Sequence, residues 1–180
     1  MTRLLGIDLG QRRVGLALAD RDGSAARPLA TIRRSSGLEG DVTAIRIIVD
    51  RYEVDELVVG DPLEAAGDEG PQATTTRAWA AAVGERLGLP VTLRDERLSS
   101  HVAETRLGPM KRGRSGGPPS KTQRDAYRAR VDREAAAIIL QDELDARAAT
   151  SARCGPAPDV LAPAPPDPEP AVIPDTEATR

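Results

Sequence analysis

Short apolar runs alternate with longer segments of helical periodicity along most of the chain. The first run, residues 3–8, suits a buried strand, and residues 14–19 form a second run after a glycine-containing turn. A third possible strand at residues 29–32 follows the turn signal Asp22-Gly23. The chain is therefore predicted to open with an antiparallel meander of three strands.

After the meander, helices and strands are predicted to alternate. Apolar residues at helical spacing indicate helices at residues 41–51, 74–87 and 99–107 and a last long helix that ends near residue 147, with strands at residues 56–60 and 89–94. Alternation of this kind implies parallel strands with right-handed crossovers. We therefore expect an α/β fold with an RNase H-like mixed five-stranded sheet, an antiparallel meander followed by parallel strands, flanked by helices. Other mixed α/β sheets share this order.

Residues 151–180 differ in composition from the rest of the chain. They hold eight prolines, and five acidic residues against two arginines. Such a segment cannot bury enough apolar surface to offset its loss of conformational entropy, so we predict a disordered, proline- and alanine-rich acidic tail. Residues 1–150 then form the single domain. Because the tail carries the whole formal net charge of −3, the domain is neutral, and its partners depend on how charge is distributed.

Several classes of protein are excluded by residue counts. His101 and Cys154 are the only histidine and cysteine, which excludes disulfides and a zinc site of the usual Cys/His kind. No nucleophile motif accompanies His101. The sequence begins with an apolar run that lacks the pattern of a signal peptide, and no run approaches the roughly 20 apolar residues of a membrane span. We expect a cytoplasmic protein that does not bind membranes.

Acidic residues end two of the predicted strands. Asp8 closes the first apolar run, where a buried carboxylate needs a cation or hydrogen-bond donors. Asp95 and Glu96 end the strand at residues 89–94, and strand alternation directs them to opposite faces. The structural alternative is that Asp8 binds the following turn while Asp95 and Glu96 cap the helix that begins near Leu98.

Asp132 lies on the apolar face of the last predicted helix. Ala135, Ala136 and Ile139 follow it at spacings of three, four and seven residues. A buried ion pair with an arginine is the structural alternative. Three converging carboxylates would instead form an all-oxygen site suited to Mg²⁺ or Mn²⁺, and two such ions can promote hydrolysis of a phosphodiester.

Four motifs resemble those of the YqgF family, in the same order and across nearly all of residues 3–145. They are Gly6-Ile7-Asp8-Leu9-Gly10 with Arg13-Val14-Gly15-Leu16-Ala17, Val58-Val59-Gly60-Asp61-Pro62-Leu63, Asp95-Glu96-Arg97-Leu98-Ser99-Ser100, and Val131-Asp132 with Ala135-Ala136 and Ile138-Ile139-Leu140-Gln141. The resemblance implies a metal-dependent nuclease that processes the 5′ end of pre-16S ribosomal RNA in ribosome biogenesis. It makes Asp8, Glu96 and Asp132 the catalytic and metal-binding residues, with Asp95 as a fallback. Asp61 departs from the family, which usually has an uncharged residue there.

Basic residues gather in the segment 106–133, which has nine of them against Asp125 and Asp132. Such a surface suits phosphate groups, although a solvated loop and a charged helix face would look the same. Because the segment also carries Asp132, we predict that it guides a nucleic acid to the acids, through backbone and shape contacts since aromatic residues are scarce. The predicted nucleic-acid-binding residues are Arg12, Arg13, Arg97, Lys111, Arg112, Arg114 and Lys121.

Three functions remain open at this point. The leading hypothesis is a nuclease that uses two divalent ions on structured RNA. The alternatives are a Holliday junction or branched-DNA resolvase with the same acids, and a nucleic-acid-binding module whose acids are structural. A fourth, weaker resemblance links residues 6–10 to the first phosphate loop of sugar kinases and Hsp70-type ATPases, which need a second such domain. The sequence leaves open RNA or DNA, endo- or exonuclease action, the metal, and monomer or homodimer.

Overall fold

The computed structural model describes residues 2–62, 70–96, 99–110 and 118–153. Within these ranges lie five strands and four helices, each of them predicted from the sequence pattern and in the predicted order. They are β1 (Leu4–Leu9), β2 (Arg13–Ala19), β3 (Ala26–Arg33), α1 (Leu38–Tyr52), β4 (Glu56–Asp61), α2 (Pro71–Leu87), β5 (Val91–Asp95), α3 (Ser99–Leu107) and α4 (Lys121–Arg153). Strand β3 starts three residues earlier than predicted because it pairs with the whole of β2.

The strands form one mixed sheet in the order β3-β2-β1-β4-β5. The first three strands pair antiparallel, and β1, β4 and β5 pair parallel, which confirms the predicted RNase H-like α/β fold. Two register pairs matter below: Asp8 lies opposite Gly15, and Asp61 lies opposite Asp95. Since the parallel strands point the same way, their carboxyl ends lie at one edge of the sheet.

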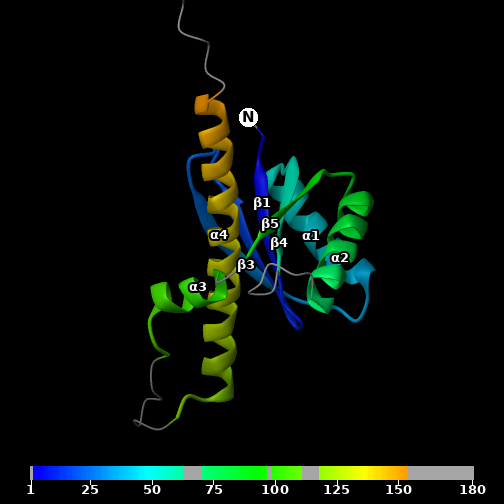
Figure 1. Cartoon of the computed structure of the whole chain (residues 1–180). Coiled ribbons are helices and arrows are strands. Elements are labelled where there is room, and N and C mark those ends of the chain that lie inside the picture. Colours follow the sequence, from blue (N-terminus) through cyan, green and yellow to red (C-terminus); the bar gives the residue numbers. More distant parts are fainter. Residues whose placement is uncertain (1, 63–69, 97–98, 111–117, 154–180) are drawn as a thin grey trace, which may run out of the picture.

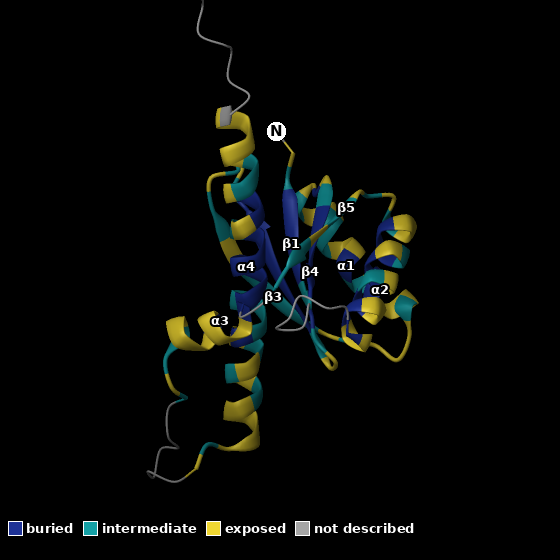
Figure 2. Cartoon of the chain, viewed as in Figure 1, coloured by how far each residue is buried: buried dark blue, intermediate teal, exposed yellow. Residues whose placement is uncertain are grey.

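The sheet lies between two helical layers (Figure 1), with α1 and α2 on one face and α4 on the other. Side chains of β1 alternate between these layers. Leu5 and Ile7 are fully buried in the core that includes Ile45 of α1 and Trp79 of α2. Leu4 packs with α4 instead. Asp8, two pleats further along, therefore faces α4. Figure 2 shows the central strands β1 and β4 buried, with exposed residues on the outer faces of the helices.

Glycines let α4 approach the backbone of the sheet. A Cβ atom on Gly6 of β1 would lie 2.7 Å from the Cβ of Leu140 and 2.8 Å from the carbonyl oxygen of Ala136. One on Gly15 of β2 would overlap the carbonyl oxygen of Asp132. Side chains here would therefore push α4 away, and the glycines fix where Asp132 lies relative to β1 and β2.

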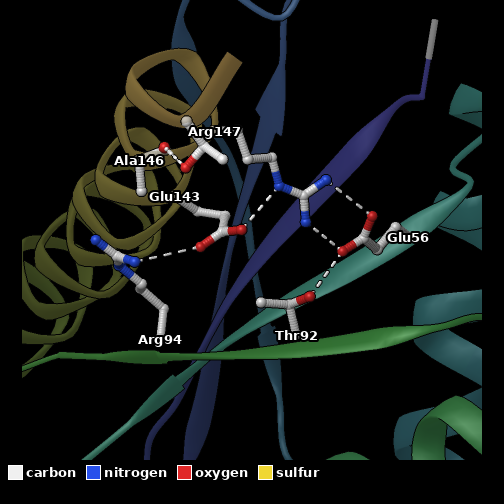
Figure 3. Close-up of polar contacts among 7 residues, drawn as sticks. Glu56, Thr92, Arg94, Glu143, Ala146 and Arg147 are labelled. Atoms are coloured by element: carbon white, nitrogen blue, oxygen red, sulfur yellow. Dashed lines mark hydrogen bonds and ion pairs between the residues drawn. The ribbon is translucent and has the colours of Figure 1, made fainter. Parts of the chain in front are cut away.

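Ion pairs attach the C-terminal half of α4 to the sheet (Figure 3). Arg147 donates to Glu143 one turn earlier at 2.7 Å and to Glu56 of β4 at 3.0 Å. Thr92 of β5 donates to Glu56 at 2.8 Å, and Arg94 lies 3.5 Å from Glu143. Arg147 lowers the pKa of Glu56 below its ordinary value, chiefly through this hydrogen bond. The network bridges α4 to two strands.

The C-terminal end of α4 differs from the predicted domain boundary. The helix continues to Arg153, three residues into the segment 151–180 that was predicted to be a disordered tail. The alanine-rich run 146–152 favours helix and explains the extension. Residues 154–180 lie outside the described ranges, so the tail stays a prediction. Despite the 33 residues of α4, no helix within the described ranges is long and apolar enough to cross a membrane.

Candidate active site

Asp8 and Glu96 lie at the carboxyl ends of parallel strands. Asp8 is the fifth residue of β1, and Glu96 follows β5 directly, where its backbone N–H donates to the carbonyl oxygen of Asp61 at 3.2 Å. The Glu96 carboxyl group lies against Gly60 of β4, where a Cβ atom would collide with Glu96 Oε2. The glycine of the second motif therefore makes room for the acid of the third.

Asp132 approaches from α4, held by an arginine. Arg13 at the start of β2 donates from Nε to Asp132 Oδ2 at 2.6 Å. Both side chains are about three-quarters buried, with exposed fractions of 23% for Arg13 and 25% for Asp132. Ala135, Ala136 and Ile139, predicted to share the face of Asp132, are all buried. The arginine pair given as the structural alternative for Asp132 is thus present in the structure.

Two of the predicted acids, Asp8 and Glu96, have raised pKa values. Burial raises the pKa of Asp8 to about 7, with a smaller contribution from the negative charge of Asp132. Burial also raises the pKa of Glu96 to about 8, followed by the charges of Asp8, Asp61 and Asp95. Asp8 is therefore the common neighbour of Glu96 and Asp132. A cluster that resists ionisation in this way is typical of functional sites, although structural clusters also produce such shifts.

Asp61 and Asp95 belong to the other side of the sheet. Asp61 ends β4, is 6% exposed, and accepts from Arg77 of α2 at 2.7 Å and 3.0 Å. Asp95 is its register partner. Side chains alternate between the two faces along β5, and Arg94 points toward Glu143 on α4. Asp95 therefore faces away from α4, and Glu96 faces toward it. This geometry favours Glu96 over the fallback Asp95.

Asp8, Glu96 and Asp132 offer the oxygen ligands that a hard divalent cation prefers. All three side chains are carboxylates, and Glu96 Oε2 is buried with no hydrogen-bond partner among the described residues. Repulsion among the carboxylates would be relieved by a bound cation. As placed, however, no three Asp, Glu, His or Cys side chains in the described ranges are grouped closely enough to hold a metal ion. The chemistry therefore fits, and the spacing would have to tighten on binding.

Three of the predicted nucleic-acid-binding residues surround Asp132 or begin its helix. Arg12 and Arg13 lie at the turn between β1 and β2, and with Gly10, Gln11, Arg128 and Asp132 they line a cavity of about 510 Å³, here called the Asp132 cavity. Lys121 is the first residue of α4. Arg97, Lys111, Arg112 and Arg114 lie outside the described residues.

Sequence reasoning missed the residues that shape this site. Gly15 and Gly60 interrupt otherwise apolar strands, and isolated strand glycines are a recognisable signal of close backbone approach. Asp61 was noted only as a departure from the family pattern, and its partner Arg77 was not noted. Nothing in the local sequence links Arg77 to Asp61, 16 residues away, because the contact depends on how α2 packs.

The chain matches known proteins in sequence over most of its length. Residues 2–146 match a family model described as "RuvX: Holliday junction resolvase". A protein of Anaeromyxobacter sp. (strain K) named "Putative pre-16S rRNA nuclease" is 46% identical over 146 residues, which cover 81% of this chain and 98% of that protein. One of the same name from Chloroflexus aurantiacus is 38% identical over 144 residues, covering 80% of this chain and 87% of that protein.

Among solved structures, a chain of "T. thermophilus RuvC in complex with Holliday junction substrate" aligns with a TM-score of 0.49 at 15% identity. The alignment covers 83% of this chain and 98% of that one. An overlay this loose supports no argument about activity.

Proposed function

The chain belongs to the RuvX family, also called YqgF, and from that membership we propose that it is a nuclease that hydrolyses phosphodiester bonds of pre-16S ribosomal RNA. The names of the curated relatives support this substrate. A nuclease that processes a ribosomal RNA precursor is expected to act in the cytoplasm.

One observation carries the proposal: Asp8 is the common electrostatic neighbour of Glu96 and Asp132. Burial of Asp8 and Glu96 costs free energy, which favours a functional role for these carboxyl groups over a purely structural one. We assign all three as catalytic, metal-binding residues. Arg12, Arg13 and Lys121 supply positive charge for the RNA backbone, together with Arg97, Lys111, Arg112 and Arg114.

Asp8, Glu96 and Asp132 would hold Mg²⁺ or Mn²⁺, as one ion or two. A divalent cation supplies a Lewis acid for the phosphate and a water of lowered pKa. The raised pKa values mean that Asp8 and Glu96 must lose protons before they act as ligands. Binding should therefore release protons and tighten as the pH rises toward 8.

Arg13 would act between the acids and the substrate. Its guanidinium now satisfies Asp132. A guanidinium offers five N–H donors, so Arg13 retains donors for a phosphate oxygen while it orients the carboxylate. It would thus hold Asp132 toward Asp8 before substrate arrives and help to neutralise the phosphate afterwards.

The test compares wild type, Asp8→Asn and Asp132→Asn on a precursor ribosomal RNA fragment in Mg²⁺, Mn²⁺ or EDTA. Asp50→Asn is the matched control, since Asp50 is exposed on α1 across the sheet. We expect metal-dependent cleavage by wild type and the control, and background rates for both site variants. Cleavage by Asp8→Asn at the wild-type rate would refute the proposal.

The family description favours a second candidate, a resolvase of branched DNA with the same acids. A four-way DNA junction in the same assay distinguishes the two. Symmetric cleavage of the junction requires a dimer, so sedimentation of the protein with the junction is the accompanying measurement. Faster cleavage of the junction than of the RNA would show that the protein is a resolvase.

A further inference from the structure

A second cavity, of about 430 Å³, lies between the end of β3 and the start of α4, here called the β3–α4 cavity. Its charged lining residues are five bases and one acid: Arg12, Arg13, Arg33, Arg34, Lys121 and Asp125. Arg33 and Arg34 lie outside the basic segment 106–133 that the sequence singled out. So much positive charge in a hollow attracts anions.

Hydrogen bonds fix the walls of this cavity. Thr31 of β3 donates from its hydroxyl to the carbonyl oxygen of Ala129 on α4 at 2.6 Å. Arg34 donates its backbone N–H to the carbonyl oxygen of Arg12 at 3.0 Å. The strand, the helix and the β1–β2 turn are therefore joined, and the bases are carried on a framework held in place.

Arg34 is positioned by a buried carboxylate. Asp41 of α1 is 1% exposed and accepts from the backbone N–H of Ser35 at 2.9 Å and from Trp79 Nε1 at 3.1 Å. Arg34 Nε lies 3.4 Å from Asp41 Oδ2, with 27% of its side chain exposed. Because Asp41 is satisfied by several donors, it orients the guanidinium of Arg34 without consuming its other N–H groups.

Of the other bases, Arg13 pairs with Asp132, and three have no acidic partner among the described residues. In the parts of the chain that the structure describes, no carboxylate forms an ion pair with Arg12, Arg33 or Lys121. Unpaired bases on a convex surface need no explanation, but these line a hollow. The β3–α4 cavity also shares Arg12 and Arg13 with the Asp132 cavity, so one basic path leads from Asp132 to the end of β3.

We propose that the β3–α4 cavity binds the sugar–phosphate backbone of the RNA substrate away from the bond that is cut. The inference rests on the proposed nuclease function and adds Arg33 and Arg34 to its binding surface. Arginine forks match phosphate oxygens in pairs. The residues that line the cavity include no aromatic side chain on which a base could stack, which favours contacts with the RNA backbone.

The test measures binding apart from cleavage. Fluorescence anisotropy of a labelled RNA duplex is followed in EDTA over a series of salt concentrations, for wild type and for Arg33→Gln with Lys121→Gln. Both residues are exposed, so the double variant should fold. Arg27→Gln is the control, an exposed arginine at the opposite end of β3.

We expect the double variant to bind roughly ten-fold or more weakly at low salt, with a salt slope smaller by about 1 to 2, and the control to match wild type. Arg34→Gln should weaken binding, and Arg34→Lys should restore part of it. An unchanged affinity and slope in the double variant would overturn the inference, as would a wild type that does not bind. Binding through the cavity without any cleavage would support this site and refute the nuclease.

Discussion

Substitution of Gly15 by alanine is the sharpest test of how the fold positions the acids. The added Cβ would overlap the carbonyl oxygen of Asp132 and lie 3.0 Å from the backbone nitrogen of Arg133. These are backbone atoms within a long helix, so no side-chain rotation relieves the contact. Helix α4 must move off β2 by about 1 Å, or the strand must bend.

Two consequences of this shift can be estimated. Overpacking of a close-packed interface costs about 1–3 kcal/mol, and we expect the upper half of that range because the colliding atoms are backbone. A displacement of about 1 Å at a reacting centre can reduce a rate roughly 100-fold. Asp132 moves with α4, so activity should fall much further than the lost stability alone explains.

The assay pairs urea unfolding with RNA cleavage in Mg²⁺ at a temperature where the variant remains folded. Gly37→Ala is the control, because nothing lies within 4 Å of its added Cβ and its backbone is extended. The control should keep wild-type activity, with a smaller change in stability that reflects the N-cap position of Gly37 on α1. If Gly15→Ala kept full activity and stability, α4 would not rest on β2 as described, and the placement of Asp132 would be refuted.

Three further predictions concern charge. In EDTA the unfolding free energy should fall as the pH rises from about 4 to about 8, because native Asp8 and Glu96 keep protons that the unfolded chain releases. The slope is about 1.4 kcal/mol per pH unit for each such proton. The double variant Asp8→Asn with Glu96→Gln should show a flatter dependence on pH. Asp61→Asn should lower the pKa of Glu96 below about 8, because the Asp61 charge contributes to raising it. NMR titration of the Glu96 carboxyl carbon measures this pKa, and an unchanged value would contradict the prediction. Arg147→Met should cost about 1–3 kcal/mol at pH 7 in urea unfolding by removing the cation that contacts both Glu143 and Glu56, and less at pH 3. An equal loss at both pH values would show that Arg147 contributes through packing and not through charge.

The sequence sufficed for the fold because its signals are local. Apolar periodicity marked every strand and helix within the described ranges, and the order of elements left few topologies. Predicted boundaries differ from the structure where tertiary contacts decide them. Strand β3 was predicted too short because its added residues, which include Arg27, Pro28 and Arg33, lack an apolar strand pattern and become a strand through pairing with β2. Helix α4 extends beyond the predicted domain boundary because the alanine residues near that boundary favour helix.

The sequence singles out the acids proposed for the site more readily than the residues that surround them. Asp8, Glu96 and Asp132 stand out because a carboxylate is anomalous at a strand end or on an apolar helix face, and that anomaly is visible without a structure. The contacts of Arg34 with Asp41, and of Arg77 with Asp61, join separate elements, and no periodicity reveals them. Arg33 looks like any exposed strand residue until α4 is seen to close a hollow beside it.

Stability and chemistry make opposite demands on the interface between α4 and the sheet. Glycines at positions 6 and 15 bring the helix against the strands, which excludes water and raises the pKa of Asp8. Burial of this kind destabilises the ionised protein, yet ionised carboxylates are what a divalent cation requires. The Arg147 network at the far half of α4 offsets that cost at a distance from the acids. Weakening the network should therefore leave the metal affinity of the folded protein unchanged. Moving the helix at Gly15 should lower both the metal affinity and the free energy of unfolding.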